Sequence, residues 1–370
     1  MKHIFIYLAL LIRATINTDA QNLDFAATEP FIPSYNGQVK WIQLDANSDE
    51  MSALVTGKNF DIPLPDTDLG SLKLFSYDPI TGAGTEVFDF DVYGGRSSFS
   101  VFYENDFVYI GFSGDIAGFD NSKQGLRVWR AIQDGNANFV EIFSDPTVFQ
   151  NNTITNIDVD DDGHTDYLVG GFSDFGFSTN RVLHNNGDGT FSMITSPAVI
   201  TDGNSDDFQS GYLDDFGRKH LVTAGASSGQ SFGYVFEKQG NGNFVQVFDL
   251  KNFPNFTGFS SFPSIEIVDT DGDGLNDISI ASLGGTKIYK NLGNLDFELH
   301  DSADTGLPPI FQGVVKYHDF DGDDLPDAVV SGSVVNENGQ TTSFASGKIL
   351  FQSGFEPSLQ SGNLQFGNPY

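Results

Sequence analysis

The chain has 370 residues, a formal net charge of −32 at pH 7 and no cysteine. Such an acidic surface argues against nucleic acid and anionic membranes as partners, because both need basic surface. The lack of cysteine excludes disulfides and a lipid-modified cysteine anchor. The 36 Phe and 41 Gly favour an all-β fold rich in turns, and the length allows one large all-β domain or two smaller domains.

Residues 1–20 are predicted to be a secretory signal peptide. Lys2 and His3 precede the apolar run 4–12, and Thr18–Ala20 offers a small-residue cleavage site. A buried N-terminal strand is the alternative. The run is too short to span a bilayer, and no other stretch is a candidate membrane span. We therefore expect a secreted or cell-surface protein, with a periplasmic location open, and a single domain over residues 21–370.

Three nine-residue acidic loops stand out further along the chain. Each has Asp at positions 1, 3, 5 and 9 and is followed by an apolar run. These residues are Asp158, Asp160, Asp162 and Asp166; Asp269, Asp271, Asp273 and Asp277; and Asp319, Asp321, Asp323 and Asp327. Carboxylates that converge repel one another, and a divalent cation relieves the repulsion. Ca²⁺ tolerates an irregular oxygen cage better than Mg²⁺, and the Leu275 carbonyl is a further donor.

Two other interpretations explain these loops less well. An EF-hand would need Glu at position 12, where Val169, Ile280 and Val330 stand, so that interpretation fails. A simple acidic solvated turn would explain one loop more readily than three, each of which leads into an apolar strand.

Internal repeats become visible when the loops and turns are aligned. Phe139, Phe191, Phe244 and Phe297 each follow a hairpin-like turn, at spacings of 52, 53 and 53 residues. Weaker copies of the acidic loop lie at Asp45–Asp49, at Tyr103–Asp106 and at Tyr212–His220, and in the last of these Arg218 and Lys219 bring positive charge. Six repeats are therefore predicted, near residues 38–95, 96–150, 151–207, 208–260, 261–310 and 311–370.

Each repeat reads as four short strands, with no sustained helical periodicity. Four-stranded units repeated about six times are typical of a β-propeller, with six blades as the first prediction and seven as the alternative. The outer strand of the last blade could come from Asn22–Phe25 or from Asn363–Phe366.

The D-x-D-x-D-G-x-x-D loop followed by an apolar strand resembles the FG-GAP (VCBS-type) repeat of integrin alpha heads and of many secreted bacterial proteins. The resemblance covers about residues 38–355. It implies about three structural Ca²⁺ sites, each between the first and second strand of a blade. The ligands that it implies are the twelve Asp residues above and the backbone carbonyls of His164, Leu275 and Leu325.

The face opposite the calcium loops is the expected ligand face, because its loops vary most in length. We expect it to bind a carbohydrate or an extracellular protein, as a non-catalytic adhesion or recognition module. Aromatic side chains could stack on such a ligand, although packing inside the fold is the alternative for each one. They are Phe119, Phe149, Phe175, Phe177, Phe253, Phe256 and Phe259.

The sequence contains only weak indications of a catalytic site. A secreted polysaccharide lyase or hydrolase is the alternative function, with Tyr93, Arg96 and Arg181 as weak candidates. Gly225–Gly229 matches G-x-S-x-G, but a strand is predicted to follow it where a nucleophile elbow needs a helix. A structural part of the cell envelope or matrix is the third possibility.

Overall fold

The structure, a computed structural model, describes a defined part of the chain. The described residues are 13–15, 24–26, 34–48, 52–59, 71–77, 84–92, 97–114, 125–146, 149–173, 178–194, 207–214, 218–227, 230–239, 243–254, 256–259, 263–282, 285–307, 309–318, 326–334, 348–352 and 359–362.

These residues form six four-stranded antiparallel sheets, in each of which the strands pair in sequence order. The first sheet consists of β3 (Ser34–Ile42), β4 (Ser52–Asn59), β5 (Ser71–Tyr77) and β6 (Gly84–Asp89). The second consists of β7 (Ser97–Glu104), β8 (Phe107–Gly114), β9 (Gly125–Ile132) and β10 (Val140–Asp145). The third consists of β11 (Phe149–Ile157), β12 (Asp166–Ser173), β13 (Ser178–Asn185) and β14 (Phe191–Ile194).

The other three sheets follow the same order. They are β15 (Asp207–Tyr212), β16 (Lys219–Ser227), β17 (Gln230–Lys238) and β18 (Phe244–Asp249); β19 (Ser264–Val268), β20 (Asp277–Ser282), β21 (Gly285–Asn291) and β22 (Phe297–His300); and β23 (Ile310–His318), β24 (Asp327–Val334), β25 (Lys348–Gln352) and β26 (Leu359–Gly362). A one-turn helix, α2 (Ser302–Thr305), follows β22. The prediction of an all-β fold built from four-stranded sheets is confirmed.

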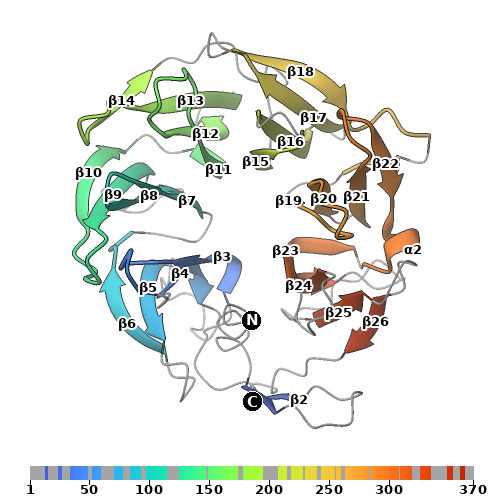
Figure 1. The fold of residues 1–370 in the computed structure, drawn as a ribbon, viewed down its shortest axis with the longest axis horizontal. Helices are drawn as coiled ribbons and strands as arrows, with labels where there is room; N and C mark the ends of the chain where they lie inside the picture. The colour runs from blue at the N-terminus through green and yellow to red at the C-terminus, as the bar shows by residue number, and fades with distance from the viewer. Residues whose placement is uncertain are drawn as a thin grey trace.

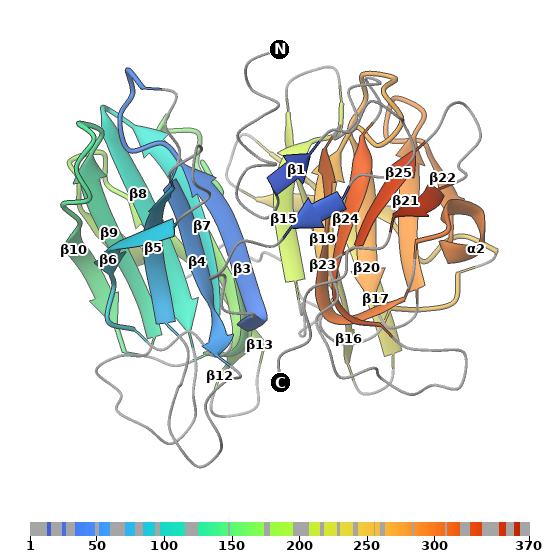
Figure 2. The ribbon, with the colours of Figure 1, turned by 90° about the horizontal axis from the view of Figure 1, so that it is seen from below.

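The sheets follow one another around a common centre, with the first strand of each sheet innermost (Figure 1). Seen from the side, the inner strands run along the axis of this ring (Figure 2). First strands of neighbouring sheets contact each other, and β23 of the sixth sheet also contacts β3 of the first. Loops between first and second strands therefore gather on one side of the ring.

The hydrophobic core is divided among the gaps between consecutive sheets. One buried cluster joins the first and second sheets, another the second and third, and so on to the fifth and sixth. Tyr167 shows how tightly a gap is filled. It is fully buried, its ring lies 5.2 Å from that of Phe102, and a Cβ added at Gly111 would lie 2.6 Å from it. Such a side chain contributes about 1.5–3 kcal/mol by burial.

The two ends of the chain do not match either predicted pairing. β2 (Asp24–Ala26) pairs with β1 (Arg13–Thr15) in a two-stranded sheet, and β26 supplies the outer strand of the sixth sheet. Residues 363–366 lie outside the described residues. The strand expected after Ser227 is present, since β17 begins at Gln230. Within the described part of the chain, no helix has the length and apolarity that a membrane span needs.

Candidate metal centres

The acidic loop of the fifth sheet joins β19 to β20 and brings three carboxylates together. Asp269, Asp271 and Asp273 each contribute one carboxylate oxygen, and these three oxygens lie within 4.8 Å of one another. Asp269 shapes the turn, because its Oδ1 accepts from the Gly272 N–H at 2.8 Å and its Oδ2 from the Gly274 N–H at 2.8 Å. Gly274 has φ +89°, which favours glycine at the bend. The loop therefore presents clustered oxygens of the kind that hard cations bind.

Asp277, at position nine, lies apart from that group. It is fully buried at the start of β20. Its Oδ2 accepts from the Thr270 N–H at 2.9 Å and its Oδ1 from the Asn291 N–H at 2.7 Å. Burial raises the pKa of Asp277, while hydrogen bonds from Thr270 and Asn291 act in the opposite sense. In this structure Asp277 braces the loop against β21, and its role as a fourth ligand stays a prediction.

Lys290 on β21 reaches the same carboxylates from the side. Its ammonium contacts Asp271 and lies 3.8 Å from an oxygen of Asp273. The hydrogen bond to Asp271 raises the pKa of Lys290. The repulsion within the loop is thus partly offset by a cation of the protein itself.

The acidic loop of the third sheet repeats the design between β11 and β12. Oxygens of Asp158, Asp160 and Asp162 lie within 4.8 Å of one another. Asp158 accepts from the Asp161 N–H at 2.7 Å and from the Gly163 N–H at 3.1 Å. The two loops are therefore built alike, as the repeated motif predicts.

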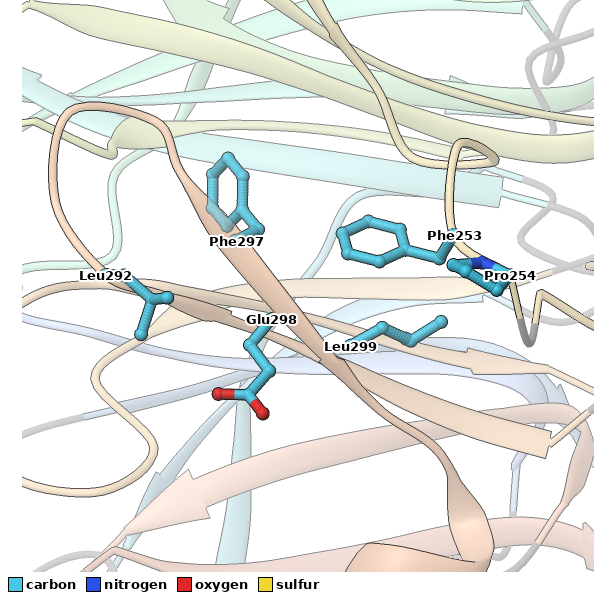
Figure 3. A pocket seen from close by; sticks show the side chains of 6 residues that line it. All are labelled: Phe253, Pro254, Leu292, Phe297, Glu298 and Leu299. Carbon is cyan, nitrogen blue, oxygen red and sulfur yellow. The ribbon is translucent and has the colours of Figure 1, made fainter.

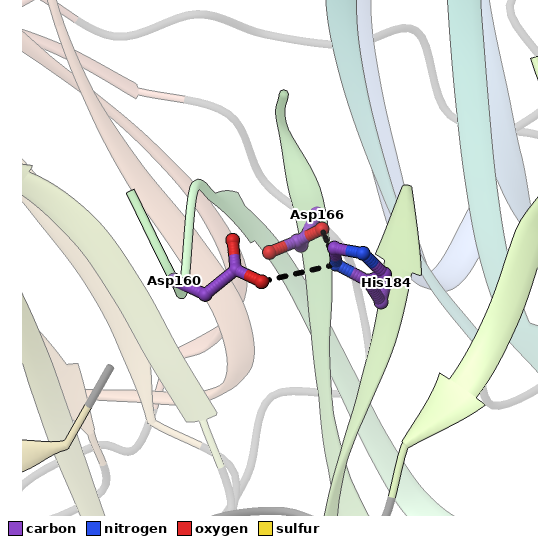
Figure 4. Close-up of side chains that lie close together, drawn as sticks. All are labelled: Asp160, Asp166 and His184. Atoms are coloured by element: carbon purple, nitrogen blue, oxygen red, sulfur yellow. Dashed lines mark hydrogen bonds and ion pairs between the residues drawn. The ribbon is translucent and has the colours of Figure 1, made fainter. Parts of the chain in front are cut away.

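Asp166 at position nine is also fully buried, and its oxygens accept from the N–H groups of Val159 and Asn185, both at 2.8 Å. Here a second group forms, since Asp160, Asp166 and His184 bring ligand atoms within 4.8 Å of one another (Figure 4). His184 Nδ1 lies 3.1 Å from Asp166 Oδ1 and 3.6 Å from Asp160 Oδ2. Burial raises the pKa of Asp166.

Both loops are tied to the preceding or following sheet. Glu104, at the end of β7, accepts from the Thr165 N–H at 3.0 Å and bonds His164 Nδ1 at 2.7 Å, which raises the pKa of His164. Asn291 donates to the Leu213 carbonyl of the fourth sheet at 2.8 Å. Order in the loops therefore depends on the packing of neighbouring sheets.

The sixth-sheet loop is described only at its end. Asp319, Asp321, Asp323 and Leu325 lie outside the described residues, and Asp327 is fully buried at the start of β24. Asp327 thus occupies the same place on its strand as Asp166 and Asp277.

The corresponding loop of the fourth sheet carries an internal cation. The Arg218 guanidinium lies 2.6 Å from Asp214 and 2.8 Å from Glu237. His220 is fully buried on β16 and pairs in register with Glu237 on β17. In the third and fifth sheets the buried residue is acidic and the third-strand residue is His184 or Lys290. In the fourth sheet the buried residue is His220, and the third-strand residue, Glu237, is the acidic one.

Sequence reasoning missed the contributions of His184, Lys290 and Glu104. A signal for the first two exists, because His184 precedes Asn185, Lys290 precedes Asn291, and each lies seven residues before the repeated Phe191 or Phe297. Glu104 has no such signal, since its contact spans two repeats.

Three of the aromatic residues proposed for the ligand face pack inside the fold. Phe253, Phe256 and Phe259 pack with the core between the fourth and fifth sheets, and Phe253 lies 5.5 Å from Tyr289. Phe119, Phe175 and Phe177 lie outside the described residues, and Phe149 begins β11. Arg181 forms an ion pair with Asp145 at 3.7 Å, while Tyr93 and Arg96 lie outside the described residues.

A shallow hollow of about 380 Å³ lies beside β22 (Figure 3). Its walls are Phe253, Pro254, Leu292, Phe297, Glu298 and Leu299. Glu298 is its one charged side chain, and Phe297 is almost fully buried. A sugar site normally places several polar groups beside an accessible ring, so this hollow does not have the character of one.

No protein-family model and no curated protein sequence matches the chain. Among solved structures, an Agrocybe aegerita lectin has a TM-score of 0.51 and 12% identity, over 89% of this chain and 80% of the lectin. That lectin specifically recognises non-reducing terminal N-acetylglucosamine. AofleA from Arthrobotrys oligospora has a TM-score of 0.50 and 12% identity, over 89% of this chain and 87% of that one. These likenesses concern the fold.

A Xanthomonas citri GH43_1 enzyme complexed with xylose is more distant. Its TM-score is 0.37 and its identity 10%, over 66% of this chain and 89% of the enzyme.

Proposed function

We propose that this chain is a secreted, calcium-binding β-propeller of six four-stranded blades that recognises carbohydrate without catalysing a reaction. The observation that carries the proposal is the recurrence of one acidic loop geometry in the third and fifth sheets, with three carboxylates in each loop. A fold of repeated sheets with equivalent cation loops fits the FG-GAP/VCBS type of repeat.

Calcium would have a structural role. Asp158, Asp160 and Asp162 would hold one ion and Asp269, Asp271 and Asp273 another, with Asp319, Asp321 and Asp323 as the third set. Bound Ca²⁺ supplies positive charge that neutralises the clustered carboxylates. It would hold each loop in place beside Glu104 or the Leu213 carbonyl, and so fasten neighbouring blades.

Carbohydrate is favoured as the ligand over an extracellular protein. The lectin with a similar fold recognises a sugar, which shows that this kind of scaffold can present a sugar site. We place the ligand on the face opposite the acidic loops, where loops of varied length meet. Those loops fall largely outside the described residues.

A glycan array run on the purified chain tests this proposal, with calcium in one arm and chelator in the other. Selective binding to one sugar class, weakened by chelator, supports it. Binding to no glycan but to an extracellular protein would redirect the proposal to adhesion. Release of reducing sugar or unsaturated product from a polysaccharide would overturn the non-catalytic assignment.

A further inference from the structure

The acidic loops of the third and fifth sheets differ in one side chain that faces them from the third strand. His184 takes this place on β13 and Lys290 on β21, each just before the Asn whose N–H donates to the buried ninth Asp. A charged ammonium has no lone pair to offer a metal, whereas a neutral imidazole does. The third-sheet loop therefore contains a nitrogen donor that the fifth-sheet loop lacks.

The His184 nitrogen lies at distances from the two carboxylates that are close to those around one small ion. A tetrahedral zinc ion lies about 2.0–2.2 Å from its nitrogen and oxygen ligands, which places neighbouring ligand atoms roughly 3.3–3.6 Å apart. His184 Nδ1 lies 3.1 Å from Asp166 Oδ1 and 3.6 Å from Asp160 Oδ2. Figure 4 shows the imidazole turned toward both carboxylates. All three ligand atoms lie within 4.8 Å of one another, so one ion could contact all three after the group closes around it.

Asp166, the central carboxylate, is held in place before any ion arrives. It is fully buried and accepts backbone N–H groups from Val159 and Asn185, both at 2.8 Å. Outer hydrogen bonds of this kind orient metal ligands and strengthen binding. His184 lies on a strand with its side chain 19% exposed. Two of the three donors therefore stand on regular structure.

The geometry points to a mixed nitrogen–oxygen site at Asp160, Asp166 and His184 that binds a divalent transition metal of the zinc class. Imidazole with carboxylate suits such ions, whereas oxygen donors alone suit calcium. The fifth-sheet loop stays an all-oxygen site. The inference rests on the proposed function in that these loops are taken as cation sites. In the third-sheet loop, the transition metal at Asp160, Asp166 and His184 would take the place of the Ca²⁺ proposed at Asp158, Asp160 and Asp162.

Cobalt(II) is a suitable probe, because it substitutes for zinc and absorbs visible light when bound in a tetrahedral nitrogen–oxygen site. The full chain, freed of metal by chelator and dialysis, would be titrated with Co²⁺ and then with Zn²⁺. We expect one saturable absorption band that Zn²⁺ abolishes. Melting curves with and without Ca²⁺ on the same preparation report on the calcium sites separately.

His184→Lys is the matched variant, since it copies the fifth sheet, and Lys290→His is the reciprocal one. We expect His184→Lys to lose the cobalt band and to weaken Zn²⁺ binding by roughly 100-fold or more, beyond the 10–100-fold typical of an outer-shell partner. Lys290→His should add a second equivalent of Co²⁺. His184→Gln replaces the lysine variant if that variant does not fold.

A cobalt band unchanged in His184→Lys overturns the inference. So does the absence of any band in a preparation that Ca²⁺ still stabilises, and the proposed function then survives. If neither Co²⁺ nor Ca²⁺ binds the folded chain, the proposed calcium role fails as well.

Discussion

The aspartates of one acidic loop have two different structural roles. Asp269, Asp271 and Asp273 have carboxylates that cluster at the partly exposed loop. Asp277 is fully buried, and both its oxygens accept backbone N–H groups. The motif treats the four as equivalent, but burial separates them. Replacing one kind should affect cation binding, and replacing the other should affect folding itself.

We expect Asp277→Ala to lower the free energy of unfolding by roughly 2–5 kcal/mol in chelator, because two buried N–H donors lose their acceptor at about 1–3 kcal/mol each. Asp271→Ala should change it by about 1 kcal/mol or less without calcium, since it loses a partly exposed pair with Lys290. Urea unfolding with and without Ca²⁺ measures both. Equal losses in chelator for the two variants would contradict this division.

His220 gives the fourth sheet a pH dependence of known sign. Burial lowers the pKa of His220, although Asp214 and Glu237 act in the opposite sense. The folded state therefore favours the neutral imidazole. Stability from this residue is present above the ordinary pKa of about 6.5 and is lost as pH falls through 6.5 toward the lower folded-state pKa.

His220→Gln has no such titration and serves as the comparison. We expect the Tm of the wild type to fall relative to that of the variant between pH 7.5 and pH 5.5, in melting curves recorded in parallel. A difference that stays constant over this range would show that His220 is not desolvated in the folded state.

At the scale of strands and loops, connections between sheets matter more than the loops alone. Asn291 ends β21 and is fully buried; its side chain donates to the Leu213 carbonyl at 2.8 Å and to the Asn276 carbonyl at 2.9 Å. One amide thus joins the exit of β15, the acidic loop and β21.

Asn291→Ala should cost roughly 2–4 kcal/mol of unfolding free energy, because the buried Leu213 carbonyl and the partly buried Asn276 carbonyl lose their donor. Asn252→Ala, at an exposed position between the fourth and fifth sheets, is the control and should change stability by about 0.5 kcal/mol or less. Chemical denaturation measures both variants. A loss at Asn291 no larger than at Asn252 would mean that the inter-sheet hydrogen bonds contribute little.

The strands and acidic loops could be predicted because their signals are local. Apolar runs at a near-constant period located the strands, and the Asp spacing located the turns that Asp158 and Asp269 in fact shape. Contacts between repeats carry no local signal. Glu104 reaches Thr165 across 61 residues, and His184 faces Asp166 only once β12 and β13 have paired. The pairing of β1 with β2 was likewise invisible, because both segments are three residues long.

At the scale of the whole molecule, stability is shared among the gaps between sheets. Among the described residues, each of the five gaps from the first sheet to the sixth holds a buried cluster, and the acidic loops of the third and fifth sheets form hydrogen bonds to the preceding sheet. Electrostatic repulsion destabilises this compact arrangement, because the chain carries a formal net charge of −32. Cations that bind only the folded ring should therefore stabilise it as a unit.

Calcium should raise the Tm of the whole protein. Each site contributes about 1.4 kcal/mol at free Ca²⁺ ten times its dissociation constant. Differential scanning calorimetry in chelator, in Ca²⁺ and in Mg²⁺ at matched ionic strength is the test. The gain should be clearly larger with Ca²⁺ than with Mg²⁺. The same gain from Na⁺ alone would show general screening and not specific sites.

The guanidinium bridge of Arg218 in the fourth sheet implies an asymmetric response to the surroundings. This sheet holds its own counter-charge, whereas the clustered carboxylates of the third and fifth sheets on either side are only partly offset by Lys238 and Lys290 and would depend on bound cations as well. When divalent cations become scarce, we expect amide exchange to quicken first at the acidic loops of those two flanking sheets, while the described residues around Arg218 keep their protection. Local opening would then begin on both sides of the fourth sheet, and the fourth sheet would stay folded while cation binding closes its neighbours again.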